Sequence, residues 1–348
     1  IIPNKKSELE DVYAPFNNHE ILPQKLQNRE IRFIDAISEA IEISMKNHPN
    51  LVLMGQDIAE YGGAFKITEG FVEKFGKKRV RNTPLCEAAI VGSGLGLSIN
   101  GYKSMVEMQF ADFVTEGFNQ IINNLAKTHY RWNQNADVVV RMPTGAGTGA
   151  GPFHSQSNEA WFTKTPGLKI AYPAFPNDAK GLLIQSFEDP NPVLFFEHKK
   201  LYRSLKGNVP EGFYTTPFGK ARTVKEGNEL TIITYGLGVH IALEFAEKNP
   251  EISLDIVDLR TLIPLDTETI YESVKKCNKV IILHEDTLTC GFGAELSALI
   301  SEHCFEDLDA PILRVASMDT PIPFNKKLED QFMPNEELAE AVDKILKY

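Results

Sequence analysis

The chain has 348 residues, of which 43% are hydrophobic and 24% charged, an ordinary composition for a globular protein of one large or two smaller domains. Its formal net charge of −11 disfavours nucleic acid and anionic membranes as partners, and no run of residues is apolar enough to span a bilayer. The four cysteines lack CxxC pairs and metal-type spacing to histidines, which favours reduced thiols and a cytoplasmic protein.

The predicted elements begin after residues 1–30, a polar, irregular stretch that indicates a tail or linker. Apolar residues then keep helical spacing from Ile34 to Met45, and LVLMG at 51–55 predicts a buried strand. The pattern next predicts a helix over 85–99, strand 104–109, a long helix over 112–132, strands 137–143 and 168–173, helix 177–188 and strand 192–198. This alternation is typical of a mostly parallel sheet with helices on both faces.

A domain boundary is predicted over residues 205–228, where the alternation breaks. Strands then follow at 231–236, 253–260, 279–286 and 311–317, with helices between them and one near 335–346. The sequence therefore predicts an α/β protein of two mostly parallel-sheet domains, residues 31–204 and 229–348, joined by a linker.

One carboxylate, Glu87, stands at the start of the predicted helix over 85–99, just after Pro84. It is either a first-turn charge stabilised by the helix dipole or a group held in an apolar site for proton transfer. The nearby GSGLGLS (92–98) lies within a helix pattern, which favours close helix packing over dinucleotide binding. GAGTGAG (145–151) follows a strand without a GK[ST] ending, so it indicates a mobile active-site loop or a flexible connection rather than a phosphate loop.

Several segments, taken together and in order, resemble the β subunit of the thiamine-diphosphate-dependent 2-oxoacid dehydrogenases, the decarboxylating component of that complex. They include RVRNTPLCE (79–87), EMQFADF (107–113), GAGTGAGPFHSQS (145–157), DPNPVLFFEHKKLYR (189–203) and HEDTLTCGFGAEL (284–296). The resemblance runs from about Arg32 to the C-terminus. It implies a transketolase-like pyrimidine-binding domain followed by a transketolase C-terminal domain.

The resemblance implies a role for each matching residue. Glu87 hydrogen-bonds the pyrimidine ring of thiamine diphosphate and shares a proton with it. Phe113 packs on that ring, where some relatives have Tyr, although an aromatic residue here could also be core. Gln109 keeps the site in position or binds the substrate. His154 binds the substrate carboxylate and takes part in acyl transfer to lipoamide. Without the resemblance, His154 would be an idle loop histidine.

Two ions also follow from the resemblance. Magnesium and diphosphate are usually held by a Gly-Asp-Gly segment, which this chain lacks, so an α-type partner must supply the ligands. A potassium site is expected at Asp189 and Asn191 with backbone oxygens near Val138, Ser186 and Phe187. An Asp-Pro-Asn-Pro turn explains the same residues without an ion.

The expected function is the β part of a 2-oxoacid dehydrogenase, with 2-oxoisovalerate and related branched-chain acids favoured and pyruvate second. The alternatives are a non-catalytic scaffold subunit and a standalone transketolase-like enzyme. We expect β chains to pair in an α2β2-like assembly that docks on a lipoyl-bearing acyltransferase core through the C-terminal domain. In that domain His284, Glu285 and Asp286 are adjacent on a strand and point to alternate faces, which argues against a metal site.

The N-terminal stretch carries short apolar anchors in VYAPF (12–16), and the chain opens on Ile rather than Met. We expect the C-terminal half of a fused α–β polypeptide, with residues 1–30 as a connecting segment packed over its partner. Processing or disorder would explain the missing Met equally well.

Overall fold

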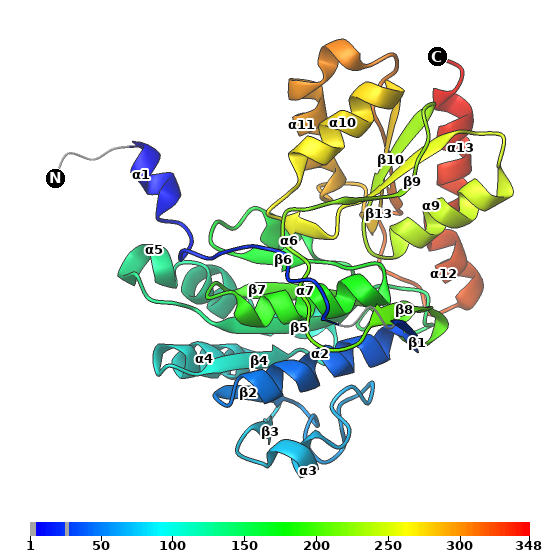
Figure 1. Cartoon of the computed structure of the whole chain (residues 1–348). Helices are drawn as coiled ribbons and strands as arrows, with labels where there is room; N and C mark the ends of the chain where they lie inside the picture. The colour runs from blue at the N-terminus through cyan, green and yellow to red at the C-terminus, as the bar shows by residue number, and fades with distance from the viewer. Residues whose placement is uncertain (1–4, 25–27) are drawn as a thin grey trace.

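Two large sheets organise the protein in a computed structural model that describes residues 5–24 and 28–348 (Figure 1). The first sheet has seven strands in the order β12-β6-β7-β5-β4-β2-β3, and all are parallel to their neighbours except β12. Its strands are β2 (Leu51–Gly55), β3 (Val80–Asn82), β4 (Lys103–Glu107), β5 (Val138–Thr144), β6 (Lys169–Ala171), β7 (Val193–His198) and β12 (Thr261–Ile263). The carboxyl ends of its parallel strands share one edge, where α/β proteins place their sites.

The second sheet has five strands in the order β14-β13-β10-β11-β9, with only β9 antiparallel to its neighbour among the described pairs. Its strands are β9 (Arg222–Lys225), β10 (Leu230–Thr234), β11 (Leu254–Asp258), β13 (Val280–Thr287) and β14 (Leu313–Ser317). The helices of this half are α9 (Leu237–Lys248), α10 (Thr267–Cys277), α11 (Gly293–His303), η3 (Phe305–Asp307), α12 (Lys326–Phe332) and α13 (Asn335–Ile345). The predicted fold class, two mostly parallel-sheet domains, is confirmed.

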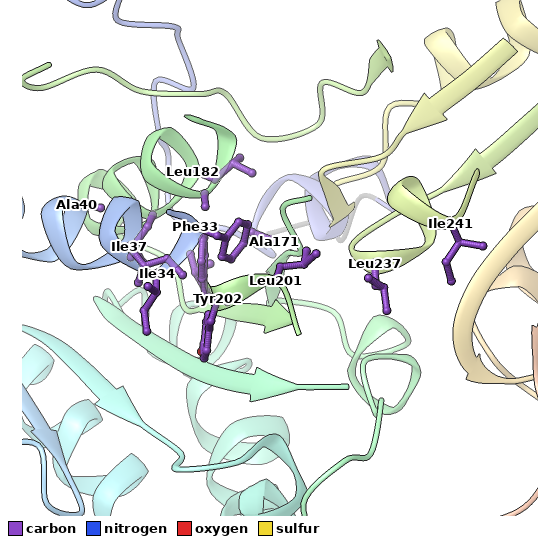
Figure 2. Packing of buried hydrophobic residues seen from close by; sticks show 14 of the residues in the cluster. Phe33, Ile34, Ile37, Ala40, Ala171, Leu182, Leu201, Tyr202, Leu237 and Ile241 are labelled. Carbon is purple, nitrogen blue, oxygen red and sulfur yellow. The ribbon is translucent and has the colours of Figure 1, made fainter. Parts of the chain in front are cut away.

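The apolar stripe of α2 (Phe33–Asn47) explains how the first sheet is covered. Ile34, Ile37, Ile41 and Met45 are all buried, as the helical spacing predicts. With α7 (Pro176–Glu188), α2 forms a layer whose side chains meet beside the sheet (Figure 2). Leu237 of α9 belongs to the same buried cluster, so apolar packing continues from the first domain into the second.

On the opposite face of the first sheet lie α4 (Glu87–Ile99) and the segment that follows β4. The stretch 112–132 is helical, as predicted, but it is not one uniform α-helix. The chain instead forms a 3-10 helix η1 (Ala111–Gly117), a π-helix η2 (Gln120–Leu125) and α5 (Thr128–Trp132). Gly117, the last residue of η1, comes so close to α4 that an added Cβ would lie 3.2 Å from Val91 Cγ2. The remaining helices are α3 (Phe71–Phe75), α6 (Ala160–Thr163) and α8 (Leu201–Ser204).

The predicted linker contains regular structure. Strand β8 (Lys206–Pro210) pairs antiparallel with β1 (Asn28–Arg32), and β9 joins the second sheet. The two domains are further tied together by β12, which comes from the C-terminal half of the chain but forms the edge of the first sheet. Of the helices in residues 5–24 and 28–348, none combines the length and the apolarity required to cross a membrane.

The N-terminal segment contains a short helix, α1 (Lys5–Glu10), at the periphery of the molecule in Figure 1, where Glu8 Oε2 accepts from the Tyr130 hydroxyl of α5 at 2.5 Å. The anchors that follow make contacts within this chain, and the expectation that the segment packs over a partner stays a prediction. The Tyr13 hydroxyl donates to the Leu168 carbonyl at 3.0 Å, and the Ala14 amide donates to Asn191 Oδ1 at 2.7 Å. Residues 1–4 and 25–27 of the predicted tail lie outside the described residues.

Candidate active site

Glu87 begins α4 at the carboxyl edge of the first sheet, as predicted. Its side chain is only 9% exposed, and its Oε1 accepts a hydrogen bond of 2.8 Å from Gln56 Nε2. Gln56 directly follows β2, so the strand end and the helix start place the two side chains together. Among the described residues, Gln56 Oε1 is buried without a hydrogen-bond partner. A buried carboxylate beside an unpaired amide oxygen suits a ligand that offers both an acceptor and donors, such as an aminopyrimidine ring.

Phe113 and His154 meet at the same edge of the sheet. Phe113 lies in η1, and its ring centroid is 5.5 Å from that of His154, at an interplanar angle of 84°. Phe110 contacts the same imidazole edge-on, with centroids 4.7 Å apart. Phe113 and His154, two of the predicted site residues, are thus in contact. Phe110 is a third member of this group, and no role was predicted for it. Its position in the EMQFADF segment was the available signal.

The position of Glu87 relative to this aromatic group follows from the packing of η1 on α4. An added Cβ on Gly117 would lie 3.4 Å from the Glu87 carbonyl oxygen, so η1 passes directly beside the first turn of α4. Gln109, which is half-buried, lies between the end of β4 and η1. The four residues predicted for cofactor and substrate therefore occupy adjoining segments at one sheet edge.

The loop that carries His154 is fastened to η1 by Asp112. The Asp112 carboxylate, which is buried, accepts hydrogen bonds from the Ser155 amide at 3.1 Å and the Gln156 amide at 3.0 Å. Gln156 also closes the loop at its base, because its carbonyl accepts from the Thr144 hydroxyl at 2.8 Å. Ser155 and Gln156 therefore shape the loop, as expected from the sequence.

A buried charge network lies beneath this edge and was not predicted. The Arg141 guanidinium, on β5, donates to both carboxylate oxygens of Glu197 at 2.6 Å each and also to Glu107. The Tyr202 hydroxyl donates to Glu197 Oε2 at 2.7 Å. All four side chains are buried, so the charges are compensated by one another. The network joins β4, β5 and β7 at the point where they reach the site.

A second polar cluster lies between the two domains. Glu285 Oε2, on β13, is 2.5 Å from His198 Nε2, and Glu285 Oε1 accepts from the Ala146 amide. The Tyr235 hydroxyl donates to Glu159 Oε1 at 2.8 Å. Burial, with a smaller contribution from Asp286, raises the pKa of Glu159 to about 8. Glu159 therefore holds a proton at neutral pH inside the interface between the domains.

His284 and Asp286 flank Glu285 but point elsewhere, as the strand alternation predicts. The His284 ring stacks on Tyr235 with centroids 6.3 Å apart, and burial lowers the His284 pKa to about 4. Burial raises the pKa of Asp286 to about 6. Within residues 5–24 and 28–348, no group of three or more His, Cys, Asp and Glu side chains is arranged to hold a metal ion.

A cavity of about 230 Å³ opens between the glycine loop and the C-terminal domain. Its walls come from both domains: Pro152, Gln156, Ser157, Trp161, Glu285, Asp286, Thr287, Thr320, Pro321, Ile322 and Phe332. The cavity is therefore bordered by the loop that carries His154 and by the acidic end of β13.

The expected potassium site centres on Asp189 and Asn191, whose side chains both have partners within the chain. The Lys169 ammonium pairs with the buried Asp189 carboxylate, and it lies 5.0 Å from the ring centroid of Phe16. Both polar atoms of the Asn191 side chain are used by the Ala14 backbone. The carboxylate and the amide are thus satisfied within the chain, and the potassium site stays a prediction.

Comparison with known proteins gives a consistent result over both domains. The family model for the transketolase pyrimidine binding domain matches residues 29–204, and that for the transketolase C-terminal domain matches residues 219–338. The 2-oxoisovalerate dehydrogenase subunit beta of Bacillus subtilis (strain 168) is 47% identical over 314 residues, covering 89% of this chain and 96% of that relative. The pyruvate dehydrogenase E1 component subunit beta of the same organism is 40% identical over 326 residues, covering 92% of this chain and 99% of that relative.

Among solved structures, a split-gene transketolase described as an inactive beta4 tetramer superposes with a TM-score of 0.72. The match covers 91% of this chain and 98% of that one at 23% sequence identity. At this identity the match supports the fold alone.

Proposed function

Since the chain belongs to the family of 2-oxoacid dehydrogenase β subunits, with a transketolase pyrimidine-binding domain and a transketolase C-terminal domain, we propose that it forms half of a thiamine-diphosphate-dependent decarboxylase site. The observation that carries the proposal is the buried Glu87 carboxylate, paired with Gln56 at the carboxyl edge of the sheet. A structural first-turn charge would lie in solvent, whereas this one is buried and bonded to an amide whose oxygen has no partner among the described residues.

The chain's own residues divide the work as follows. Glu87 hydrogen-bonds the pyrimidine ring nitrogen and shares a proton with it, and Gln56 orients the carboxyl group of Glu87. Phe113, in η1, offers an aromatic surface, and Phe110 limits the freedom of the His154 ring. His154 binds the substrate carboxylate and moves a proton during acyl transfer to a lipoyl group. When bound, thiamine diphosphate supplies the electron sink for loss of carbon dioxide.

The diphosphate and its magnesium need ligands from an α-type partner, because the Gly-Asp-Gly segment is missing from this sequence. In our proposal, two paired β chains assemble with two α-type chains. This assembly docks on a lipoyl-bearing acyltransferase core in the cytoplasm. The potassium site at Asp189 and Asn191, with backbone oxygens near Val138, Ser186 and Phe187, stays a prediction.

For the substrate, the relative with 47% identity favours 2-oxoisovalerate and similar branched-chain acids, and the relative with 40% identity makes pyruvate the second candidate. The test is steady-state decarboxylation by the chain assembled with its α-type partner, thiamine diphosphate and magnesium. We expect kcat/KM to be higher for 2-oxoisovalerate than for pyruvate by tenfold or more, a ratio that a pocket shaped for a branched chain can provide (~1–3 kcal/mol). A preference for pyruvate would contradict the branched-chain assignment, and turnover of neither acid would contradict the proposed function.

A further inference from the structure

The glycine loop after β5 turns its backbone amides toward the C-terminal domain. Gly147 and Gly149 have φ values of +86° and +71°, a conformation that other residues rarely adopt. Left-handed residues at alternate positions make successive amides converge on one side, and such a concave row of N–H groups binds anions. The backbone of the loop therefore provides a preformed set of N–H donors that can hold a hydrogen-bond acceptor.

The acceptor in that site is a side chain of the same polypeptide. Glu329 Oε1 accepts from the Gly147 amide at 2.8 Å, and Glu329 Oε2 accepts from the Gly149 amide at 2.9 Å. The Glu329 side chain is buried, although α12 is otherwise mostly exposed. Hydrogen bonds to a carboxylate are stronger than those between neutral groups, and more so away from water.

The fold of α12 explains why Glu329 points inward. The Asn325 side chain caps the helix by accepting from the Lys327 amide at 3.0 Å. Glu329 and Phe332, three residues apart, form the buried stripe, whereas Lys326 and Asp330 pair with each other in solvent. Just before the helix, the Phe324 ring packs so closely on the loop that an added Cβ on Gly151 would overlap it.

His154 lies between two carboxylates that act on the loop from different domains. Asp112 holds the amides of Ser155 and Gln156 on the C-terminal side of the histidine. Glu329 holds Gly147 and Gly149 on its N-terminal side. Lys199 lies beneath, donating to the Gly145 carbonyl at 2.7 Å. The loop is therefore fixed at both ends. At its N-terminal end Lys199 and Glu285 hold Gly145 and Ala146, and Glu329 holds the Gly147 and Gly149 amides.

We propose that Glu329 is a positioning residue that fastens the glycine loop through the Gly147 and Gly149 amides and thereby holds His154 in place for acyl transfer. The part that concerns acyl transfer rests on the proposed function, whereas the fastening of the loop does not. The C-terminal domain, on this account, contributes to the site through α12 as well as through Glu285.

The test compares Glu329→Ala, Glu329→Gln and the matched control Asp330→Asn, a neighbouring exposed carboxylate on the same helix. The full chain assembled with its α-type partner is used throughout. Amide hydrogen exchange of peptides within 144–157 reports the loop directly. Reductive acylation of a lipoyl domain and decarboxylation with an artificial electron acceptor are measured in parallel.

We expect Glu329→Ala to speed exchange of the loop amides by about tenfold or more, as expected for loss of a charged acceptor, and Asp330→Asn to leave it unchanged. Glu329→Gln keeps one acceptor oxygen, so its exchange should be intermediate. The ratio of acylation to decarboxylation should fall in the same order, about tenfold in Glu329→Ala.

Unchanged loop exchange in Glu329→Ala would overturn the proposal. Faster exchange with an unchanged ratio would overturn the part that concerns His154. If even the wild-type assembly turned over no 2-oxoacid, the proposed function would fail, while the exchange measurement would still decide whether Glu329 fastens the loop.

Discussion

At the scale of single residues, Glu87 combines burial with a partner that fixes its direction. Gln56 Nε2 donates a hydrogen bond of 2.8 Å to Glu87 Oε1. Both side chains are buried at the sheet edge, which limits their contact with water. A glutamate placed in this way can share a proton with a ring nitrogen that lies against it. Its function therefore depends on the charge and on the acceptor oxygen, not on the volume of the side chain.

Glu87→Gln keeps the volume but removes the proton-sharing carboxylate. We expect the decarboxylation rate of the assembled enzyme to fall by about 10²- to 10⁴-fold, the usual contribution of general acid–base catalysis. The far-UV circular dichroism and the unfolding midpoint should stay close to those of the wild type. A rate within a few fold of the wild type would show that Glu87 is only a first-turn residue.

His154 is assigned to acyl transfer rather than to cofactor activation. In His154→Ala, reduction of lipoyl groups should therefore be lost, whereas decarboxylation measured with an artificial electron acceptor should persist at a reduced level. The two assays are run on the same preparation. Equal losses in both would indicate a general role in substrate binding, and no loss in either would indicate an idle loop histidine.

Glu159 makes stability depend on pH. Its pKa in the folded protein is raised to about 8, mainly by burial, so the folded state keeps a proton that the unfolded chain releases near pH 4.5. Stability from this group is therefore complete below about pH 4.5 and is lost as pH rises toward 8. The slope is at most about 1.4 kcal/mol per pH unit for one proton.

Glu159→Gln removes that titration while keeping an acceptor for the Tyr235 hydroxyl. We expect the wild type to lose stability relative to this variant between pH 5 and pH 8, as measured by urea unfolding. The exposed Glu247→Gln is the control and should follow the wild type at every pH. A constant difference between Glu159→Gln and the wild type would contradict the account.

At the scale of elements, the Arg141 network joins three parallel strands beneath the site. Replacement by Met leaves Glu107 and Glu197 buried without their cation, which typically costs about 3–5 kcal/mol. The urea midpoint of Arg141→Met should fall accordingly. Lys46→Met, which breaks an exposed pair with Glu42, should change stability by about 1 kcal/mol or less. Similar midpoints for the two variants would refute a structural role for the network.

Elements whose pattern is local were predictable from the sequence. The helix over 33–47 has four buried residues at helical spacing, and LVLMG is a fully buried strand, so one periodicity dominates each segment. The stretch 112–132 is helical as its composition suggests, but its change from 3-10 to π and α turns was not predicted, and the close approach of Gly117 to α4 is tertiary. Local propensity gives way where packing of this kind decides the backbone.

The site shows the same division. Glu87, Phe113 and His154 lie in segments with a distinctive local context, so they could be predicted, and the structure places Phe113 against His154. Glu329 and Gly147 are 182 residues apart and meet only because the second domain packs on the first. No spacing in the sequence indicates such a contact.

At the scale of the whole molecule, both domains position the residues at the carboxyl edge of the first sheet. The first sheet ends in Glu87, Gln109 and the glycine loop, and the second domain holds that loop through Glu285 and Glu329. The proposed site has aromatic side chains and a buried carboxylate, but this sequence has no Gly-Asp-Gly segment for a diphosphate. The central claim is therefore that the chain forms half of an active site.

The most direct measurement is thiamine-diphosphate-dependent decarboxylation of 2-oxoisovalerate by the purified chain, with magnesium, before and after addition of an α-type partner that carries a Gly-Asp-Gly segment. We predict no activity above background for the chain alone and full turnover once the partner is added. Substantial decarboxylation by the chain with no partner present would contradict the account.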